Sequence, residues 1–352
     1  MNVSLRGTTT MVREGEVKFT ATDKVKLDNL QNYDDTKIVA DIQACNSEHI
    51  SIIGTLTNLT NRLAVAEQKL TDLSKTDIAV VTSAEDLAQP TKDLVITLAE
   101  PVANTKAVIS GKSVEIKAAE VNSGCIQITT DGDVTVKNVV ATGVCDKNTF
   151  GNAQLNVPKG KYVNISDSNI SQTGYNGIEI GGTSAVKNVV IDNVQVVGAL
   201  TNNGISIYHT EDGAVVTISN CTIKNCSNAV RLSNCDGGKL IVNLINCDLE
   251  WNLNPGDNAR DYIGIIIFQD YTSKSADEAA ANNLFGRDKV QINMIGCTSR
   301  GEAITFENIE DVCGSKTADQ LFYVYRDKGG LVAFGDGSAY PVFSIDGKVY
   351  NA

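Results

Sequence analysis

Residues 134–250 contain a repeat that restricts the folds available to this chain. Four segments of eight residues align without gaps, and apolar residues alternate with polar ones in each. These segments are 163–170, 189–196, 216–223 and 242–249. Such alternation is what a strand with one buried face requires. An Asp or Asn marks a turn and recurs every 26 to 29 residues, at positions 138, 167, 193, 220 and 246.

A second family of strands falls between these segments. Its members begin at residues 125, 177, 204 and 229, and residues 303–306 fit as a later member. A unit of this length with two short strands cannot bury its own apolar face, so it must stack on its neighbours. Stacking each strand on its counterpart gives parallel pairing and one continuous core. The sequence therefore predicts a mainly β protein, with a right-handed parallel β-helix (a solenoid) over residues 76–314.

A β-sandwich and a TIM barrel are the alternatives to a solenoid. A sandwich does not demand a fixed period. A barrel needs an amphipathic helix between its strands, and the intervals 181–187 and 209–214 are too short and too rich in Gly, Thr and Asp to supply one. The repeat is interrupted by an insertion at 251–288. Residues 315–352 are rich in aromatic residues and glycine turns, which predicts a C-terminal β cap.

Residues 36–75 have a different period, with apolar residues spaced alternately by four and three. Five such heptads exceed the three or four expected of a coiled coil, and Leu at a with Ile or Leu at d favours three strands. The alternative is a single amphipathic helix packed on the solenoid, and Gly54 lowers the helix propensity half-way along. The predicted trimerisation residues are Ile38, Ile42, His49, Ile52, Leu56, Leu59, Arg62, Leu63, Glu67, Leu70 and Leu73.

Two details of this heptad segment favour a trimer of set register. Arg62 lies at a g position, from which it can reach Glu67 at e of a neighbouring chain. The segment 62–67 also looks like the Arg-h-x-x-h-Glu signature of trimeric coiled coils, where h is hydrophobic. His49 occupies an a position, where a polar side chain would set the register of the three helices.

Composition excludes several classes of partner. The net charge is −12 and no basic stripe is present, so nucleic acid and anionic membrane are poor partners. No apolar run approaches the roughly 18 residues that cross a bilayer, and the first twenty residues lack the apolar stretch of a secretory signal. Cys221, Cys247 and Cys297 share one column of the repeat, which predicts buried thiols rather than disulfides or a metal site.

Parallel β-helices often cleave polysaccharides, which makes an enzyme the competing hypothesis. A glycoside hydrolase needs two carboxylates about 5 to 9.5 Å apart. The outward positions of the second strand family contain only one acidic residue. These positions hold Gln127, Glu179, Ser206, Arg231 and Thr305. With no nucleophile elbow, P-loop or dinucleotide fingerprint either, the sequence predicts no catalytic residue, no metal and no cofactor.

Two segments near the start carry a resemblance to a known group of proteins. Residues 19–28, FTATDKVKLD, are similar to the F-T-A-x-D-K-x-K-L-D segment near the base of bacteriophage fibre proteins. Residues 33–38, YDDTKI, look like the Y-D-D-T-x-I lead-in to the coiled coils that follow it. With a trimeric coiled coil and a terminal β-helix, the layout resembles a phage fibre or spike. The short arm is most similar to a head fibre, as in the crAss-like phages.

This resemblance implies a homotrimeric structural protein of the virion surface, assembled in the host cytoplasm. An extended arm, residues 1–35, would dock on the capsid or a capsid-associated protein, and the β-helix would contact a host surface or glycan. The residues expected to dock are Phe19, Lys24 and Leu27, and those expected to contact a receptor are Trp251, Tyr262 and Tyr271. The alternatives are a tail fibre or tail-spike with glycan-depolymerase activity, and an adhesin from outside phages, against which the missing export signal argues.

Overall fold

The computed structural model is mainly β and divides into two compact units, Met1–Asn46 and Ser47–Ala352. The described residues are 20–31, 41, 45, 52–63, 65, 78–83, 87–146, 153–198, 203–233, 236–250, 264–270, 284–307, 322–326, 330–333 and 341–349. In the first unit the described element is α1 (Ala21–Gln31). In the second, a helix covers residues 52–63 and 65, and all other described elements are strands.

The N-terminal end of α1 is closed by a capping box. The backbone N–H of Asp23 donates to Thr20 Oγ1 at 3.2 Å, and the backbone N–H of Thr20 donates to Asp23 Oδ2 at 2.9 Å. Hydrogen bonds from Thr20 also lower the pKa of the Asp23 carboxyl. The predicted extended arm is therefore wrong over residues 21–31. The cap satisfies two N–H groups that a helix start leaves unpaired, and Lys, Leu and Ala in the segment support the helix.

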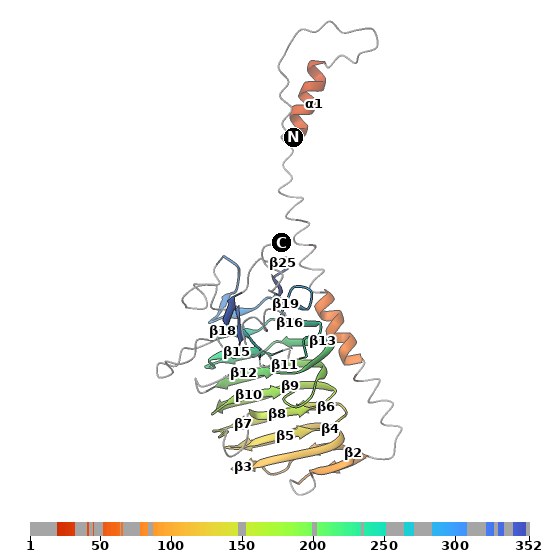
Figure 1. Ribbon diagram of the computed structural model, residues 1–352, viewed down its shortest axis with the longest axis vertical. Coiled ribbons are helices and arrows are strands. Elements are labelled where there is room, and N and C mark those ends of the chain that lie inside the picture. Colours follow the sequence, from red (N-terminus) through yellow and green to blue (C-terminus); the bar gives the residue numbers. More distant parts are fainter. Residues whose placement is uncertain are drawn as a thin grey trace. The chain divides into compact units, whose positions relative to one another are not determined.

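The first predicted strand family is confirmed as one parallel ladder (Figure 1). Each strand pairs with its counterpart in the next repeat. In ladder order the strands are β1 (Ile78–Val81), β2 (Ala88–Thr97), β4 (Lys106–Asn122), β6 (Val134–Lys137), β9 (Tyr162–Thr173), β11 (Val186–Gly198), β13 (Thr210–Ser219), β16 (Leu240–Ile245), β19 (Val290–Ile295) and β24 (Val342–Ile345).

A shorter ladder follows the turn in each repeat. It joins β3 (Val102–Ala103), the end of β4, β7 (Val139–Thr142), the ends of β9 and β11, β14 (Thr222–Lys224), β17 (Asp248–Leu249) and β20 (Thr298–Ser299).

The second predicted strand family forms the remaining parallel ladder. It joins the start of β4, β5 (Cys125–Thr129), β8 (Ala153–Lys159), β10 (Asn176–Ile180), β12 (Asn203–Ile207), β15 (Asn228–Leu232), β18 (Gly264–Asp270) and β22 (Phe322–Arg326). Residues 303–306 are not a member, so the prediction is wrong there. Instead β21 (Glu302–Ala303) folds back antiparallel on β20, because Arg300 and Gly301, both with positive φ, turn the chain.

Two antiparallel pairs occur in the last described segments. β22 pairs with β23 (Gly330–Ala333), and β24 pairs with β25 (Lys348–Val349). Each pair therefore attaches one extra strand to the end of a parallel ladder.

The core consists of aliphatic side chains that stack from one strand to the next. In the first ladder, one inward column is Val134, Val163, Val189, Val216 and Val242, all 2% exposed or less. Burying each such side chain stabilises the fold by about 1.5–3 kcal/mol relative to leaving it in water. Because neighbouring repeats share this column, the buried side chains form one continuous cluster along the second unit.

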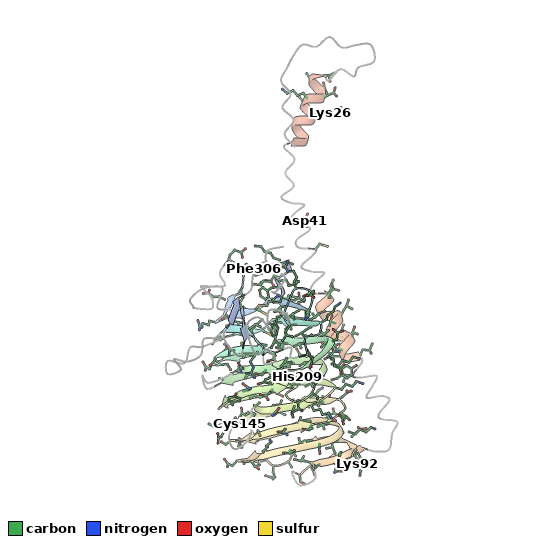
Figure 2. All side chains as sticks on the ribbon, in the orientation of Figure 1. Lys26, Asp41, Lys92, Cys145, His209 and Phe306 are labelled. Carbon is green, nitrogen blue, oxygen red and sulfur yellow. The ribbon has the colours of Figure 1, made fainter. Side chains whose placement is uncertain are left out.

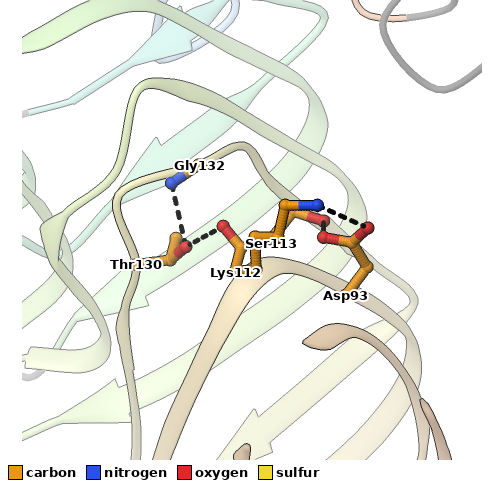
Figure 3. Close-up of polar contacts among 5 residues, drawn as sticks. All are labelled: Asp93, Lys112, Ser113, Thr130 and Gly132. Atoms are coloured by element: carbon orange, nitrogen blue, oxygen red, sulfur yellow. Dashed lines mark hydrogen bonds and ion pairs between the residues drawn. The ribbon is translucent and has the colours of Figure 1, made fainter. Parts of the chain in front are cut away.

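Polar contacts tie the first strands of this stack together (Figure 3). Ser113 Oγ on β4 donates to Asp93 Oδ1 on β2 at 2.9 Å. Thr130 Oγ1, after β5, donates to the carbonyl of Lys112 at 2.7 Å and accepts the Gly132 N–H at 3.0 Å. The contacts thus join three successive repeats at the end where the stack begins.

The predicted turn residues all adopt the left-handed backbone conformation. Their φ values lie between 50° and 54°. These residues are Asn138, Asp167, Asn193, Asn220 and Asn246. Most L-residues pay about 1–2 kcal/mol for this conformation, whereas Asn and Asp tolerate it. The turn column also carries hydrogen bonds between repeats, because Asn220 Nδ2 donates to Asp192 Oδ1 at 2.8 Å.

We expect Asn220→Val to lower the free energy of unfolding by about 1–3 kcal/mol. The change places a β-branched residue at positive φ and removes the bond to Asp192. Asn220→Gly is the matched control, because glycine accepts this φ and loses only the hydrogen bond. Urea denaturation of both variants compares them. Equal stability of the Val and Gly variants would show that the φ at this turn carries no cost.

The predicted thiol column is confirmed. Cys221, Cys247 and Cys297 are buried, without disulfides. The Sγ atoms of Cys247 and Cys297 each donate to a backbone carbonyl of the preceding repeat at 3.3 Å. The hydrogen bond with Cys221 raises the pKa of the Cys247 thiol to about 12.

Candidate functional site

The helix of residues 52–63 and 65, called the docked helix below, lies against the outer face of the first ladder (orange in Figure 1). Near its start, a Cβ added to the buried Gly54 would lie 3.2 Å from Ile245 Cδ1 of β16. Further along, Asn188 Nδ2 of β11 donates to Asn61 Oδ1 at 3.4 Å. These contacts place small and polar residues of the helix on the strands.

A groove continues this contact towards β9. On the helix side it is lined by Asn61, Arg62 and Val65, and on the strand side by Tyr162, Val163, Asn164, Asn188 and Val190. Val190 points away from the core, between the inward Val189 and Ile191, yet is only 7% exposed. Its neighbours in the same outward column, Thr217 and Asn243, are also buried. Cover of Val190 by the helix explains why an outward position is shielded.

The opposite side of the docked helix exposes an apolar stripe. Ile52, Leu56, Leu59 and Leu63 are each between 51% and 58% exposed. At about 100° per residue, their spacing places them on one face, roughly 200° from Gly54. Four large aliphatic side chains on one exposed helix face are unusual for a monomer and typical of a protein–protein contact.

The face that the docked helix turns to the strands differs from the face expected of a single amphipathic helix. A single amphipathic helix would pack its apolar face on the strands. The docked helix does lie on the strands, but it does so with Gly54 and Asn61, and the Oδ1 atom of Asn58 is buried as well. The predicted trimerisation residues Leu56 and Leu59 remain exposed. The residues of the predicted seam are thus left available in a single chain.

The remaining predicted site residues are distributed as follows. Arg62 is exposed beside the stripe, and Lys24 is exposed on α1. The residues Ile38, Ile42, His49, Glu67, Leu70 and Leu73, the docking residue Phe19, the side chain of Leu27, and the receptor residues Trp251, Tyr262 and Tyr271 lie outside the described residues.

The ladder that joins β5, β8, β10, β12 and β15, called the third ladder below, has an outward column whose middle part is polar and buried. Glu179, Ser206 and Arg231 follow one another in register and are 2%, 0% and 5% exposed. Asn176 Nδ2 donates to Glu179 Oε2 at 2.8 Å, and Arg231 stacks on the Tyr208 ring at 4.6 Å. This column holds one carboxylate and one guanidinium, two strands apart, rather than the two carboxylates of a glycosidase.

Sequence reasoning missed a buried ladder of asparagines beside this column. Asn203 Nδ2 donates to Asn176 Oδ1 at 2.9 Å, and Asn228 Nδ2 donates to Asn203 Oδ1 at 2.8 Å. All three residues are 4% exposed or less. The signal was present, because an Asn precedes the repeated Gly-Ile, Gly-Ile and Ala-Val pairs of the second strand family.

The described part of the chain contains neither a metal-binding cluster nor a membrane-spanning helix. No group of three or more His, Cys, Asp or Glu side chains is placed there to hold a metal ion. No helix in that part is long and apolar enough to cross a membrane. Comparison of the chain with protein-family models, with curated proteins and with solved structures gave no match.

Proposed function

We propose that this chain is a homotrimeric structural protein of a bacteriophage virion, a head fibre attached to the capsid through its N-terminal arm. The observation that carries the proposal is the exposed stripe of the docked helix, whose members lie at heptad positions a and d. The resemblance of residues 19–28 and 33–38 to phage fibre segments supplies the biological class.

In this proposal the strands of the second unit form a right-handed parallel β-helix, which is a suitable architecture for a fibre. Parallel ladders support it, since each strand hydrogen-bonds to its counterpart one repeat later. Such a stack has no need of a large globular core and can be lengthened repeat by repeat. The antiparallel pairs β22–β23 and β24–β25 support a cap over the last repeats.

Trimerisation gives such a protein its mechanism of attachment. Three chains joined at residues 36–75 present three arms to one site on the capsid. Once one arm binds, the other two are at a high effective concentration near their sites. Contacts that are weak singly therefore attach the fibre firmly to the capsid. The β-helix would then contact a host surface or glycan, through residues that include Trp251, Tyr262 and Tyr271.

In this proposal the protein works by attaching to the capsid and contacting a surface, without a catalytic centre. Among the described residues, the polar column of the third ladder supports this, because Glu179 is its single carboxylate and it is bound to Asn176. Among the described residues, no specific contact favours the tail-spike depolymerase or the adhesin.

Light scattering of the purified full-length protein tests the proposal. We expect a mass of three chains of 37.5 kDa each. We also expect antibodies against the protein to label the capsid, not the tail, of phage particles in electron micrographs. A monomer in solution would refute the trimer. Labelling confined to the tail would instead move the protein to the tail-fibre alternative.

A further inference from the structure

We infer that the docked helix stays on its own strands when three copies assemble, so that three stacks of strands stand side by side around the helices. The partner of the exposed stripe is then a second copy of this chain. The inference rests on the proposed trimer and adds its arrangement, because a fibre could equally be built with a free coiled coil that leads into separate stacks.

The heptad assigns the two faces of the helix to two different tasks. Leu56 and Leu63 occupy a positions, and Ile52 and Leu59 occupy d positions, which form the seam of a coiled coil. The strand-facing residues at 54, 58, 61 and 65 fall at c and f, the positions on the outside of a coiled coil. A helix can therefore contact its own strands and two partner helices at the same time.

Charge favours a second copy as the occupant of the stripe. Arg62, at g, is exposed on its flank, and five residues later the same chain carries Glu67 at e. In a parallel bundle the g residue of one helix approaches the e residue of the next, so each copy supplies both halves of the ion pair. A partner with an apolar surface alone would offer no carboxylate to Arg62.

Undocking the helix would carry a cost that the side-by-side arrangement avoids. It would expose Val190, which is 7% exposed in the docked state, and break the hydrogen bond between Asn61 and Asn188. The free coiled coil recovers neither contact, since both come from the outer face of the helix. Keeping the helix docked retains these contacts and still buries the seam.

The order of the contacts between the docked helix and the strands also gives the direction in which the helix runs along the stack. Gly54 meets Ile245 of β16, whereas Asn61 meets Asn188 of β11, two strands earlier in the ladder. Seven helical residues rise about 10 Å, and two strand spacings span about 9.5 Å, so the helix runs along the stack from later strands to earlier ones.

This direction relates the docked helix to the two ends of the stack. The docked helix starts over the late strands, and β1 and β2 lie at the other end. Figure 2 shows Lys92 of β2 at one end of this unit and Phe306 at the other. The docked helix therefore begins at the end of the stack that carries the last repeats and points towards the end formed by β1 and β2.

Cross-linking within the full-length protein tests the arrangement. Asn61→Cys and Asn188→Cys are introduced together, joined by a short bis-maleimide, and the mass is measured by light scattering before and after the reaction. Both sites are partly exposed, so the variant is expected to fold. Val65→Cys with Asn164→Cys, across the same groove, is a second pair that repeats the test at other positions and leaves Arg62 in place.

The chain allows a clean background for this experiment. Cys45 is exposed, and Cys45, Cys235 and Cys313 are replaced by Ser beforehand. The other thiols are buried. Burial raises the pKa of the Cys226 thiol to about 12, which keeps it out of the maleimide reaction.

A matched control pair tests the direction. Ile241 is the counterpart of Asn188 two strands later in the ladder and is 40% exposed. Asn61→Cys with Ile241→Cys should not cross-link, because the second thiol is displaced by about 9.5 Å. Efficient linkage of this pair would refute the direction of the helix.

We expect the Asn61–Asn188 link to form within one chain and the protein to remain a trimer. A trimer that becomes monomeric on cross-linking would show that the seam needs a released helix, and a trimer that forms no link would show that the helix has left its strands. Either result overturns the inference but leaves the trimer standing. A monomer before any cross-linking would refute the proposed function itself and the inference with it.

Discussion

Replacing Leu56 and Leu59 together with glutamate is expected to convert the trimer into a monomer. These side chains occupy adjacent a and d layers, and both are more than half exposed in a single chain. Six leucines, each about half exposed in the single chain, would become buried in the trimer, and each would contribute about 0.8–1.5 kcal/mol, half the value for a fully exposed leucine. The double variant loses that burial and places six carboxylates in the seam, where like charges repel.

Light scattering at several protein concentrations measures the effect. The monomer should keep its strand content by circular dichroism, because neither leucine faces the strands. Val80→Glu is the matched control, since Val80 is 74% exposed on β1 and lies outside the heptads. We expect that variant to stay trimeric. A double variant that keeps the mass of three chains would place the interface elsewhere.

Asn203→Ala is expected to lower the free energy of unfolding by about 2–4 kcal/mol. The side chain of Asn203 donates to Asn176 Oδ1 and accepts from Asn228 Nδ2 inside the fold. Removing it leaves buried polar groups without that partner, at about 1–3 kcal/mol each. The Asn203 N–H, 3.4 Å from Asn176 Oδ1, retains part of the ladder and limits the loss.

Denaturation in urea, followed by circular dichroism, measures this effect. The control is Asn169→Ala, because Asn169 is exposed on β9 and a surface change of this kind usually alters stability by less than about 0.5 kcal/mol. If both variants were equally stable, the asparagine ladder would be a consequence of the stacking rather than a source of stability.

Local properties of the sequence predicted the strands well. The period-two alternation of residues such as Val189 and Ile191 marked the ladders, and the turn residue Asn193 marked where each strand bends. Both signals can be read from the sequence alone, because side-chain alternation and tolerance of positive φ are properties of one or two residues. The fixed spacing of the repeats then specified which strands pair.

The errors arose where the pattern was short. Residues 303–306 alternate like a member of the second strand family, but the turn at Arg300 and Gly301 sends them back on β20. The helix α1 was not predicted because its side chains show no marked apolar face. Only the pair Thr20 and Asp23 signals its start.

By itself the sequence determined the repeat, the turns, the thiol column and the apolar stripe of the docked helix. Only the tertiary structure decided which face of that helix meets the strands. A heptad groups residues on faces, but the choice between faces depends on how closely the helix can approach strands far away in the chain. Gly54 permits close approach to Ile245, and Asn61 finds a polar partner in Asn188, so the small polar face docks and the leucines remain exposed.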